Sequence, residues 1–227
     1  MVSSTQGRIS TKDYVYLQLK KEIVGGELLP EAQINELDLS KRFDISRTPL
    51  REALQRLEIE ELVVRLPNGR LKISPVSVED ARSIFSVRSA LEGLVTKAAT
   101  QNANERDLEE LRLLTELLVK AANLGNNEDV IYYGDQIHHR LYDMSQHKFA
   151  VKILNNMNDH IMRYRRIGPN TSHTRSKEAA KEHLELYETI AAGNAEQAEK
   201  LMQKHINNSL DAAIQSIEAH LQTQNCK

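Results

Sequence analysis

Hydrophobic residues recur at helical spacing through most of the chain. Residues 11–24 show this spacing until Gly25-Gly26 ends it. Two shorter helical patterns follow over residues 34–43 and 47–59. Ser46 is placed to cap the second of these, and Pro49 is tolerated in its first turn, where no N–H is needed. Three helices are therefore predicted in the first 60 residues.

Residues 63–73 alternate between apolar and polar side chains instead. The alternation is interrupted by Pro67-Asn68-Gly69, and Asn-Gly is a strong signal for a tight hairpin turn. A β-hairpin is predicted, with one apolar face and one basic face. The expected apolar face comprises Val64, Leu66, Leu71 and Ile73.

After Ser77 the spacing is helical almost to the C-terminus. Ser77 has the N-cap spacing to Asp80, so a new helix should begin there. Stops rich in Asn and Gly divide the remainder into helices of bundle length. They fall at residues 102–104, 125–127, 168–170 and 193–194. The fold class is predicted to be mainly α, ending in an all-helical antiparallel bundle.

Composition narrows the class of protein. The 227 residues are 40% hydrophobic, enough for one or two compact domains, and no run approaches the ~18 apolar residues of a membrane-spanning helix. The start of the chain lacks an apolar signal core, and Cys226 is the single cysteine, so a cytoplasmic protein without internal disulfides is expected. The net charge of −2 is the sum of a net charge of +1 over residues 1–77 and a net charge of −3 over residues 78–227.

The helix predicted over residues 47–59 carries side chains suited to DNA. Its apolar residues share one side, which leaves an outer arc of Arg47, Thr48, Arg51 and Gln55. A helix-turn-helix presents such side chains to the major groove, where arginine can bridge guanine O6 and N7. The hairpin would then be a wing whose Arg65, Arg70 and Lys72 meet phosphates. A solvated helix face is the alternative, but the order of the elements favours DNA binding.

Residues 34–40 and 45–57, which contain S-R-T-P-L-R-E-A-L, resemble the winged helix-turn-helix of GntR-type bacterial transcription regulators, especially the FadR subfamily. The resemblance implies DNA contacts from Arg47, Thr48, Arg51 and the wing residue Gly69. Three positions depart from the family pattern: Glu31 and Glu61 replace usual glycines, and Leu37 replaces a usual basic residue. The change at Leu37 would remove one phosphate or base contact.

All eight histidines lie after residue 137. Asp135 and His139 are i, i+4 neighbours on one helix face. His183 and His205 lie ten and about eleven residues from the Gly193-Asn194 turn, so in an antiparallel pair their rings should face each other. One carboxylate and three imidazoles would suit Zn, Ni, Fe, Co or Mn.

Asp135-x-x-x-His139, Glu182-His183 and His205 resemble the metal-binding pattern of the FCD effector domain of the FadR subfamily. The resemblance implies a divalent transition metal, with zinc favoured, held by Asp135, His139, His183 and His205. The neighbouring His138 could compete with His139. The remaining histidines are interpreted as surface or structural residues: His138, His147, His160, His173 and His220.

Arg88 lies on the apolar stripe of its predicted helix, one turn before Glu92. An Arg88–Glu92 pair within the helix is one interpretation. The other is a clamp for an effector carboxylate near the metal, since arginine binds carboxylates through two N–H groups. Four further arginines near residues 168–169 are interpreted as solvated charge: Arg163, Arg165, Arg166 and Arg175.

These features predict a metal-containing DNA-binding transcription regulator rather than an enzyme. The expected segments are an arm, a winged helix-turn-helix domain of three helices and a hairpin, an all-helical metal, effector and dimerisation domain, and a tail: residues 1–10, 11–75, 76–222 and 223–227. A homodimer would bind a palindromic operator on double-stranded DNA, and a small carboxylate would complete the metal coordination, contact Arg88 and release repression.

Two alternatives remain open. The first is a metallohydrolase with an accessory winged domain. It is disfavoured because the chain has no H-E-x-x-H motif and no evident general base beyond Glu182. The second is a DNA-binding protein whose histidines are purely structural, each bonded to a backbone carbonyl.

Overall fold

The computed structural model describes residues 9–166 and 173–225, and the chain divides into two compact units, Met1–Val76 and Ser77–Lys227. Within the described residues, each helix is too short or too polar to span a bilayer. The stop expected at residues 168–170, most of the N-terminal arm and the last two residues of the tail lie outside the described residues.

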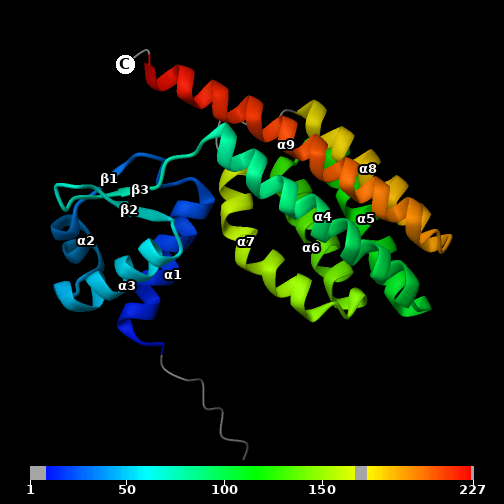
Figure 1. Cartoon of the computed structure of the whole chain (residues 1–227), viewed down its shortest axis with the longest axis horizontal. Helices are drawn as coiled ribbons and strands as arrows, with labels where there is room; N and C mark the ends of the chain where they lie inside the picture. The colour runs from blue at the N-terminus through cyan, green and yellow to red at the C-terminus, as the bar shows by residue number, and fades with distance from the viewer. Residues whose placement is uncertain (1–8, 167–172, 226–227) are drawn as a thin grey trace, which may run out of the picture. The chain divides into compact units, whose positions relative to one another are not determined.

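The N-terminal unit contains three helices and a small sheet (Figure 1). Helix α1 begins after Ser10, whose side chain accepts from the Asp13 N–H, and α2 is capped in the same way by Asn35. Ser46 stands at the N-cap of α3 but makes no side-chain capping hydrogen bond, contrary to expectation. The elements are α1 (Thr11–Gly25), β1 (Gln33–Ile34), α2 (Glu36–Phe43), α3 (Arg47–Ile59), β2 (Val63–Arg65) and β3 (Leu71–Ile73).

The sheet has the order β1-β3-β2, with both pairs antiparallel. The two-residue strand β1 is too short for alternation to be visible in the sequence. In the hairpin, Val63 pairs with Ile73 and Val64 pairs with Lys72. Paired residues share a face, so Val63 faces the core with Ile73, and the expected placement of Val64 there is wrong by one residue.

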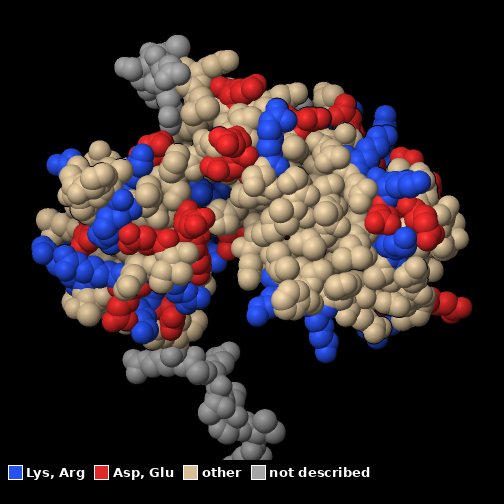
Figure 2. Space-filling model, in the orientation of Figure 1, with Lys and Arg blue, Asp and Glu red and all other residues tan. Residues whose placement is uncertain are grey.

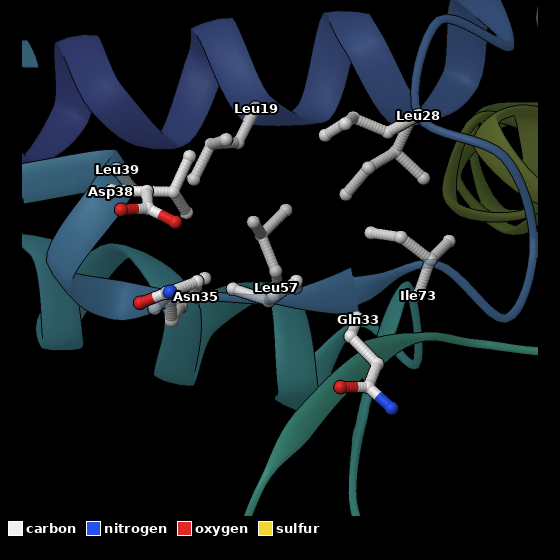
Figure 3. A pocket seen from close by; sticks show the side chains of 11 residues that line it. Leu19, Leu28, Gln33, Asn35, Asp38, Leu39, Leu57 and Ile73 are labelled. Carbon is white, nitrogen blue, oxygen red and sulfur yellow. The ribbon is translucent and has the colours of Figure 1, made fainter. Parts of the chain in front are cut away.

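Apolar side chains from all three helices and the hairpin form the core of this unit. Leu50, Leu54 and Leu57 of α3 are buried, which orients the opposite side of α3 toward solvent. A pocket of about 190 Å³ lies beside Leu57 and is lined in part by side chains of α1, α2 and α3 (Figure 3). Its polar side chains are Gln33, Asn35 and Asp38.

In the described residues of the C-terminal unit, helices are joined by short turns (Figure 1). The Ser77 hydroxyl accepts from the Asp80 N–H at 2.9 Å, as its spacing predicts, and Asn194 accepts from the Gln197 N–H at 3.3 Å. Helix α4 packs along α9, and α5 packs against α6 and α8. The helices are α4 (Val78–Asn102), α5 (Glu105–Leu124), α6 (Asn127–Ser145), α7 (Lys148–Arg166), α8 (His173–Ala191) and α9 (Ala195–Asn225).

The predicted fold class is confirmed. The chain is mainly α, with a winged helix-turn-helix unit followed by an all-helical unit. The apolar faces of α4, α6, α8 and α9 meet inside the second unit, and the polar groups buried among them form the candidate metal site.

Candidate functional site

The outer side of α3 and the hairpin expose all but one of the residues that the sequence assigned to DNA contact; the exception, Lys72, is half-buried and paired with Glu31. The exposed residues are Arg47, Thr48, Arg51 and Gln55 on α3, and Arg65, Gly69 and Arg70 on the hairpin. Gly69 has φ +80°, a conformation that glycine adopts without strain at the hairpin turn. The fold thus presents one helix and one wing with exposed basic groups.

Two of these arginines form ion pairs with acidic side chains of the same unit. Arg51 Nε lies 2.9 Å from Glu36, and Arg65 lies 2.9 Å from Glu58. Figure 2 shows Lys and Arg interspersed with Asp and Glu on the visible face of this unit. Because these pairs are exposed, each stabilises the fold only slightly. The arginines can therefore exchange a carboxylate for a phosphate or a base at low cost.

In the C-terminal unit, three histidine rings meet in the interior. His138 comes from α6, His183 from α8 and His205 from α9, and their exposed fractions are 2%, 4% and 7%. The ring centroids of His183 and His205 are 4.4 Å apart, in line with their matched spacing from the turn. One potential ligand atom from each ring lies within 4.8 Å of the other two. This geometry would allow a single ion to be bound by all three.

Each ring has its Nδ1 occupied by an acceptor. Nδ1 of His138 lies 3.1 Å from Glu92 Oε2, and Nδ1 of His205 lies 2.6 Å from Glu182 Oε2. Nδ1 of His183 lies 2.8 Å from the Ala179 carbonyl oxygen. Carboxylates and carbonyls only accept, so Nδ1 carries a proton in each ring, and Nε2 carries the lone pair wherever the ring is neutral. Histidines that bind metals are oriented in this way.

Nε2 of His183 is buried and makes no hydrogen bond to any described residue. An unsatisfied buried acceptor is costly. A metal ion bound to Nε2 would remove this cost, so the residues present fit a divalent transition metal, for which imidazole nitrogen is a common ligand.

The two carboxylates that contact the histidine rings, Glu92 and Glu182, each form an ion pair with an arginine. Arg175 donates to both oxygens of Glu182 at 2.8 and 3.0 Å, and Arg88 Nε donates to Glu92 at 3.2 Å. Tyr142 also donates to Glu92, at 2.7 Å. Burial would raise the pKa of Glu92 and Glu182, but their histidine and arginine partners outweigh it, so both pKa values lie well below the usual range. Both groups are therefore carboxylates at neutral pH.

Two of the histidines, His183 and His205, are held neutral. Burial and the neighbouring rings lower the pKa of His183 well below 6.5. Burial is also the largest cause for His205, whose pKa falls to about 4. Neutral imidazole is the form that binds a metal ion, so the free protein already holds His183 and His205 in a binding-competent state.

The structure does not bring Asp135 and His139 into this cluster. Their side chains pair with each other at 3.5 Å, and the His139 side chain is 41% exposed. The i, i+4 spacing of Asp135 and His139 identified a real contact, but it lies on a different face of α6 from His138. His138 was missed because its partner Glu92 lies 46 residues away, a relationship that local spacing does not reveal.

The other predicted residues have varied environments. Arg88 is buried and paired with Glu92, as one of the two interpretations expected. Arg163 is buried and Arg175 is bonded to Glu182, so the expectation of solvated charge is wrong for both. Among the remaining histidines His147 is exposed, and His160 and His220 are half-buried. The side chains of Arg165, Arg166 and His173 lie outside the described ones.

Two family models match the two units. The model described as bacterial regulatory proteins of the gntR family matches residues 11–73, and the FCD domain model matches residues 83–208. The second match alone covers more than half of the chain.

Whole-length relatives agree with these matches. The HTH-type transcriptional regulator YdhC of Bacillus subtilis is 29% identical over 197 residues, covering 86% of this chain and 88% of YdhC. A probable D-xylose utilization operon transcriptional repressor of Paenarthrobacter nicotinovorans is 23% identical, covering 86% of this chain and 89% of the repressor. The structure of Escherichia coli McbR/YncC aligns with TM-score 0.73 at 23% identity, covering 92% of this chain and 99% of McbR.

These relatives are transcription regulators, and the fold is shared with them, so the metallohydrolase alternative is not supported. The N-terminal match is to a family of DNA-binding regulators, and the C-terminal match is to the FCD effector-binding domain. The chain belongs to the GntR family of bacterial transcription regulators, with an FCD domain as its C-terminal half.

Proposed function

We propose that this regulator is a metal-containing sensor of a small carboxylate, and that binding of this carboxylate controls its affinity for operator DNA. The buried set of His138, His183 and His205 carries the proposal, because each Nδ1 is hydrogen-bonded and one potential ligand atom from each ring lies within 4.8 Å of the other two. Purely structural histidines would not require an unpaired Nε2 on His183.

The proposed ligands are His138, His183 and His205, with His138 taking the place expected for His139. Zinc is favoured, and nickel, manganese, iron or cobalt would also accept imidazole ligands. When bound, the ion would supply a positive charge and open coordination positions for an effector carboxylate. Glu92 and Glu182 would orient two of the rings and raise their basicity.

Arg88 is the proposed second contact for the effector. Its Nε donates to Glu92, which uses one of the five N–H groups of a guanidinium. A carboxylate that binds Arg88 would compete with Glu92, the same residue that orients His138. Effector binding would therefore be coupled to the orientation of a metal ligand through one shared carboxylate.

At the DNA, we propose that Arg47, Thr48, Arg51 and Gln55 read the major groove while Arg65, Gly69 and Arg70 contact the backbone beside it. Winged domains of this size read short half-sites, so two copies on a palindrome are proposed as the working unit. The named repressor among the relatives favours repression released by effector. The effector would act to the extent that it binds the two DNA-affinity states unequally.

The experiment begins by selecting the operator from a random DNA library with the purified full-length protein. Operator affinity is then measured by fluorescence anisotropy with and without Zn²⁺ and with a panel of small carboxylates. Wild-type protein should lose affinity with one class of carboxylate only when Zn²⁺ is present. His183→Ala should abolish this response, whereas His147→Ala, at an exposed histidine of the same unit, should retain it. A carboxylate response that survives His183→Ala would contradict the proposal.

A further inference from the structure

Arg51 is held by a carboxylate from the neighbouring helix. Its Nε lies 2.9 Å from Oε2 of Glu36, the first residue of α2, while Arg51 itself lies on the outer side of α3. Of the four α3 residues proposed to read the major groove, Arg51 alone makes a side-chain hydrogen bond or ion pair with another described residue. This contact sets Arg51 apart from Arg47, Thr48 and Gln55.

The contact uses one nitrogen of the guanidinium and leaves the other two. Within the described part of the chain, neither Nη1 nor Nη2 of Arg51 has a hydrogen-bond partner. These two nitrogens form the end of the planar fork, and the fork can bridge O6 and N7 of one guanine. Arg51 can therefore bind a base without giving up its bond to Glu36.

Arg65 on the hairpin is held in a different way. Its Nε and Nη2 donate to the two oxygens of Glu58 at 3.2 and 2.9 Å, and its Nη1 donates to the Gly69 carbonyl at 3.3 Å. Every nitrogen of this guanidinium is therefore already bonded within the DNA-binding unit. A contact from Arg65 to DNA must share or replace one of these bonds, whereas a contact from Arg51 need not.

The local structure fixes Glu36 more firmly than Arg51. Glu36 begins α2 directly after the cap Asn35, whose side chain accepts from the Leu37 N–H at 3.0 Å. A negative side chain is favoured in the first turn of a helix. The Glu36 side chain is 28% exposed, against 65% for Arg51. Glu36 is therefore the fixed partner, and Arg51 is the side chain that is held.

Holding Arg51 in advance favours base reading over general attraction to DNA. A long side chain loses rotamer freedom when it is immobilised at an interface, and a contact that is formed beforehand reduces this cost. The pair has no net charge, so it adds little to the attraction to phosphates that any DNA sequence shares. The gain is expected only where a guanine lies opposite the fork.

We infer that Glu36 is a positioning residue for sequence recognition, holding Arg51 through Nε so that Nη1 and Nη2 are presented together to a guanine. The inference rests on the proposed function, because it requires α3 to lie in the major groove. It adds the residue that gives Arg51 its orientation and the base that Arg51 reads.

The test compares Glu36→Ala with Glu27→Ala in the full-length protein. Both variants lose one negative charge, but Glu27 is an exposed carboxylate with no ion-pair partner among the described residues, so Glu27→Ala is the matched control. Affinities are measured by fluorescence anisotropy for the operator selected with wild type and for a random duplex of equal length. Operators in which one guanine of each half-site is replaced by 7-deazaguanine, which lacks the N7 acceptor, are measured in the same way.

Glu36→Ala should bind the operator about three- to tenfold more weakly than Glu27→Ala, the loss expected when one long side chain must be immobilised on binding. Both variants should bind the random duplex with equal affinity. At one guanine, 7-deazaguanine should weaken wild-type binding about fivefold. This penalty should be absent in Arg51→Ala and reduced in Glu36→Ala.

Equal operator affinity for Glu36→Ala and Glu27→Ala would overturn the inference, as would equal losses on operator and random duplex, which a merely structural role would produce. A full 7-deazaguanine penalty that persists in Glu36→Ala but vanishes in Arg51→Ala would also overturn it, and would leave Arg51 in the DNA interface. If Arg51→Ala binds the operator as wild type, the proposed role of Arg51 fails and the inference fails with it.

Discussion

His205 Nδ1 lies 2.6 Å from the carboxylate of Glu182, which also accepts hydrogen bonds from two N–H groups of Arg175. Asn208 adds a further donor to Glu182 at 2.9 Å. The carboxylate is thereby fixed in the position that keeps the proton on Nδ1 and the lone pair on Nε2. Orientation of His205 depends on this contact.

Replacing Glu182 should therefore weaken metal binding without removing a ligand. Glu182→Gln lacks the negative charge that stabilises the oriented ring, and loss of such a partner lowers metal affinity by about 10–100-fold. Zn²⁺ affinity measured by chelator competition checks this. Glu185→Gln, at an exposed position of the same helix, should bind as wild type. Equal affinities for the two variants would show that Glu182 does not orient the ring.

Arg51 should contribute to operator affinity. Its exposed side chain projects from α3, and an arginine that bridges a guanine or a phosphate contributes about 1–3 kcal/mol. Arg51→Ala should weaken binding to the selected operator accordingly. Arg106→Ala removes an exposed arginine from α5 and should leave the affinity unchanged. A normal footprint for Arg51→Ala would remove Arg51 from the DNA interface.

Substitutions of Arg88 and Glu92 should have coupled effects on the free energy of unfolding. Arg88→Met leaves the fully buried Glu92 without its cation, and breaking a buried pair from one side typically costs about 3–5 kcal/mol. The hydrogen bonds from His138 and Tyr142 remain, so the lower end is expected. Adding Glu92→Gln should recover part of the loss, as measured by urea unfolding. Strictly additive losses would contradict this coupling.

The stability of the N-terminal unit should depend on the ionisation of Glu60. Burial raises the pKa of Glu60, but donation from Tyr16 and Lys20 outweighs it, so the pKa lies below the usual 4.5. Since the folded pKa is the lower one, the carboxylate stabilises the fold above about pH 4.5, and this contribution is lost as the pH falls further.

Glu60→Gln should accordingly destabilise the protein at neutral pH, and the difference from wild type should shrink as the pH falls below about 4.5. Urea unfolding followed by circular dichroism across this range provides the measurement. Glu27→Gln, at an exposed carboxylate of the same unit, supplies the control. A difference from wild type that stays constant with pH would mean that Glu60 is not preferentially ionised in the folded state.

Local signals predicted the helices of the DNA-binding unit well. The bounds of α3 match the predicted 47–59, because the apolar spacing extends over the whole of that helix. The hairpin position was also predicted from Asn68-Gly69. Its register was not, because Val63 and Val64 are both apolar and alternation alone does not decide which of them faces the core.

The candidate metal site was predicted in part. His183 and His205 were predictable, since their distances from a single turn place them level in adjacent helices. The choice between His138 and His139 was not, because it depends on the rotation of α6 about its axis. That rotation is set by contacts with distant residues such as Glu92 on α4, which spacing along α6 does not encode.

The most direct test of the proposed metal centre compares these two adjacent histidines. Purified His138→Ala and His139→Ala proteins are titrated with Zn²⁺ in competition with a chromophoric chelator. We predict that His138→Ala loses high-affinity binding of one Zn²⁺, because it removes one of three buried ligands, and that His139→Ala binds as wild type. Retained binding in His138→Ala together with loss in His139→Ala would contradict the site.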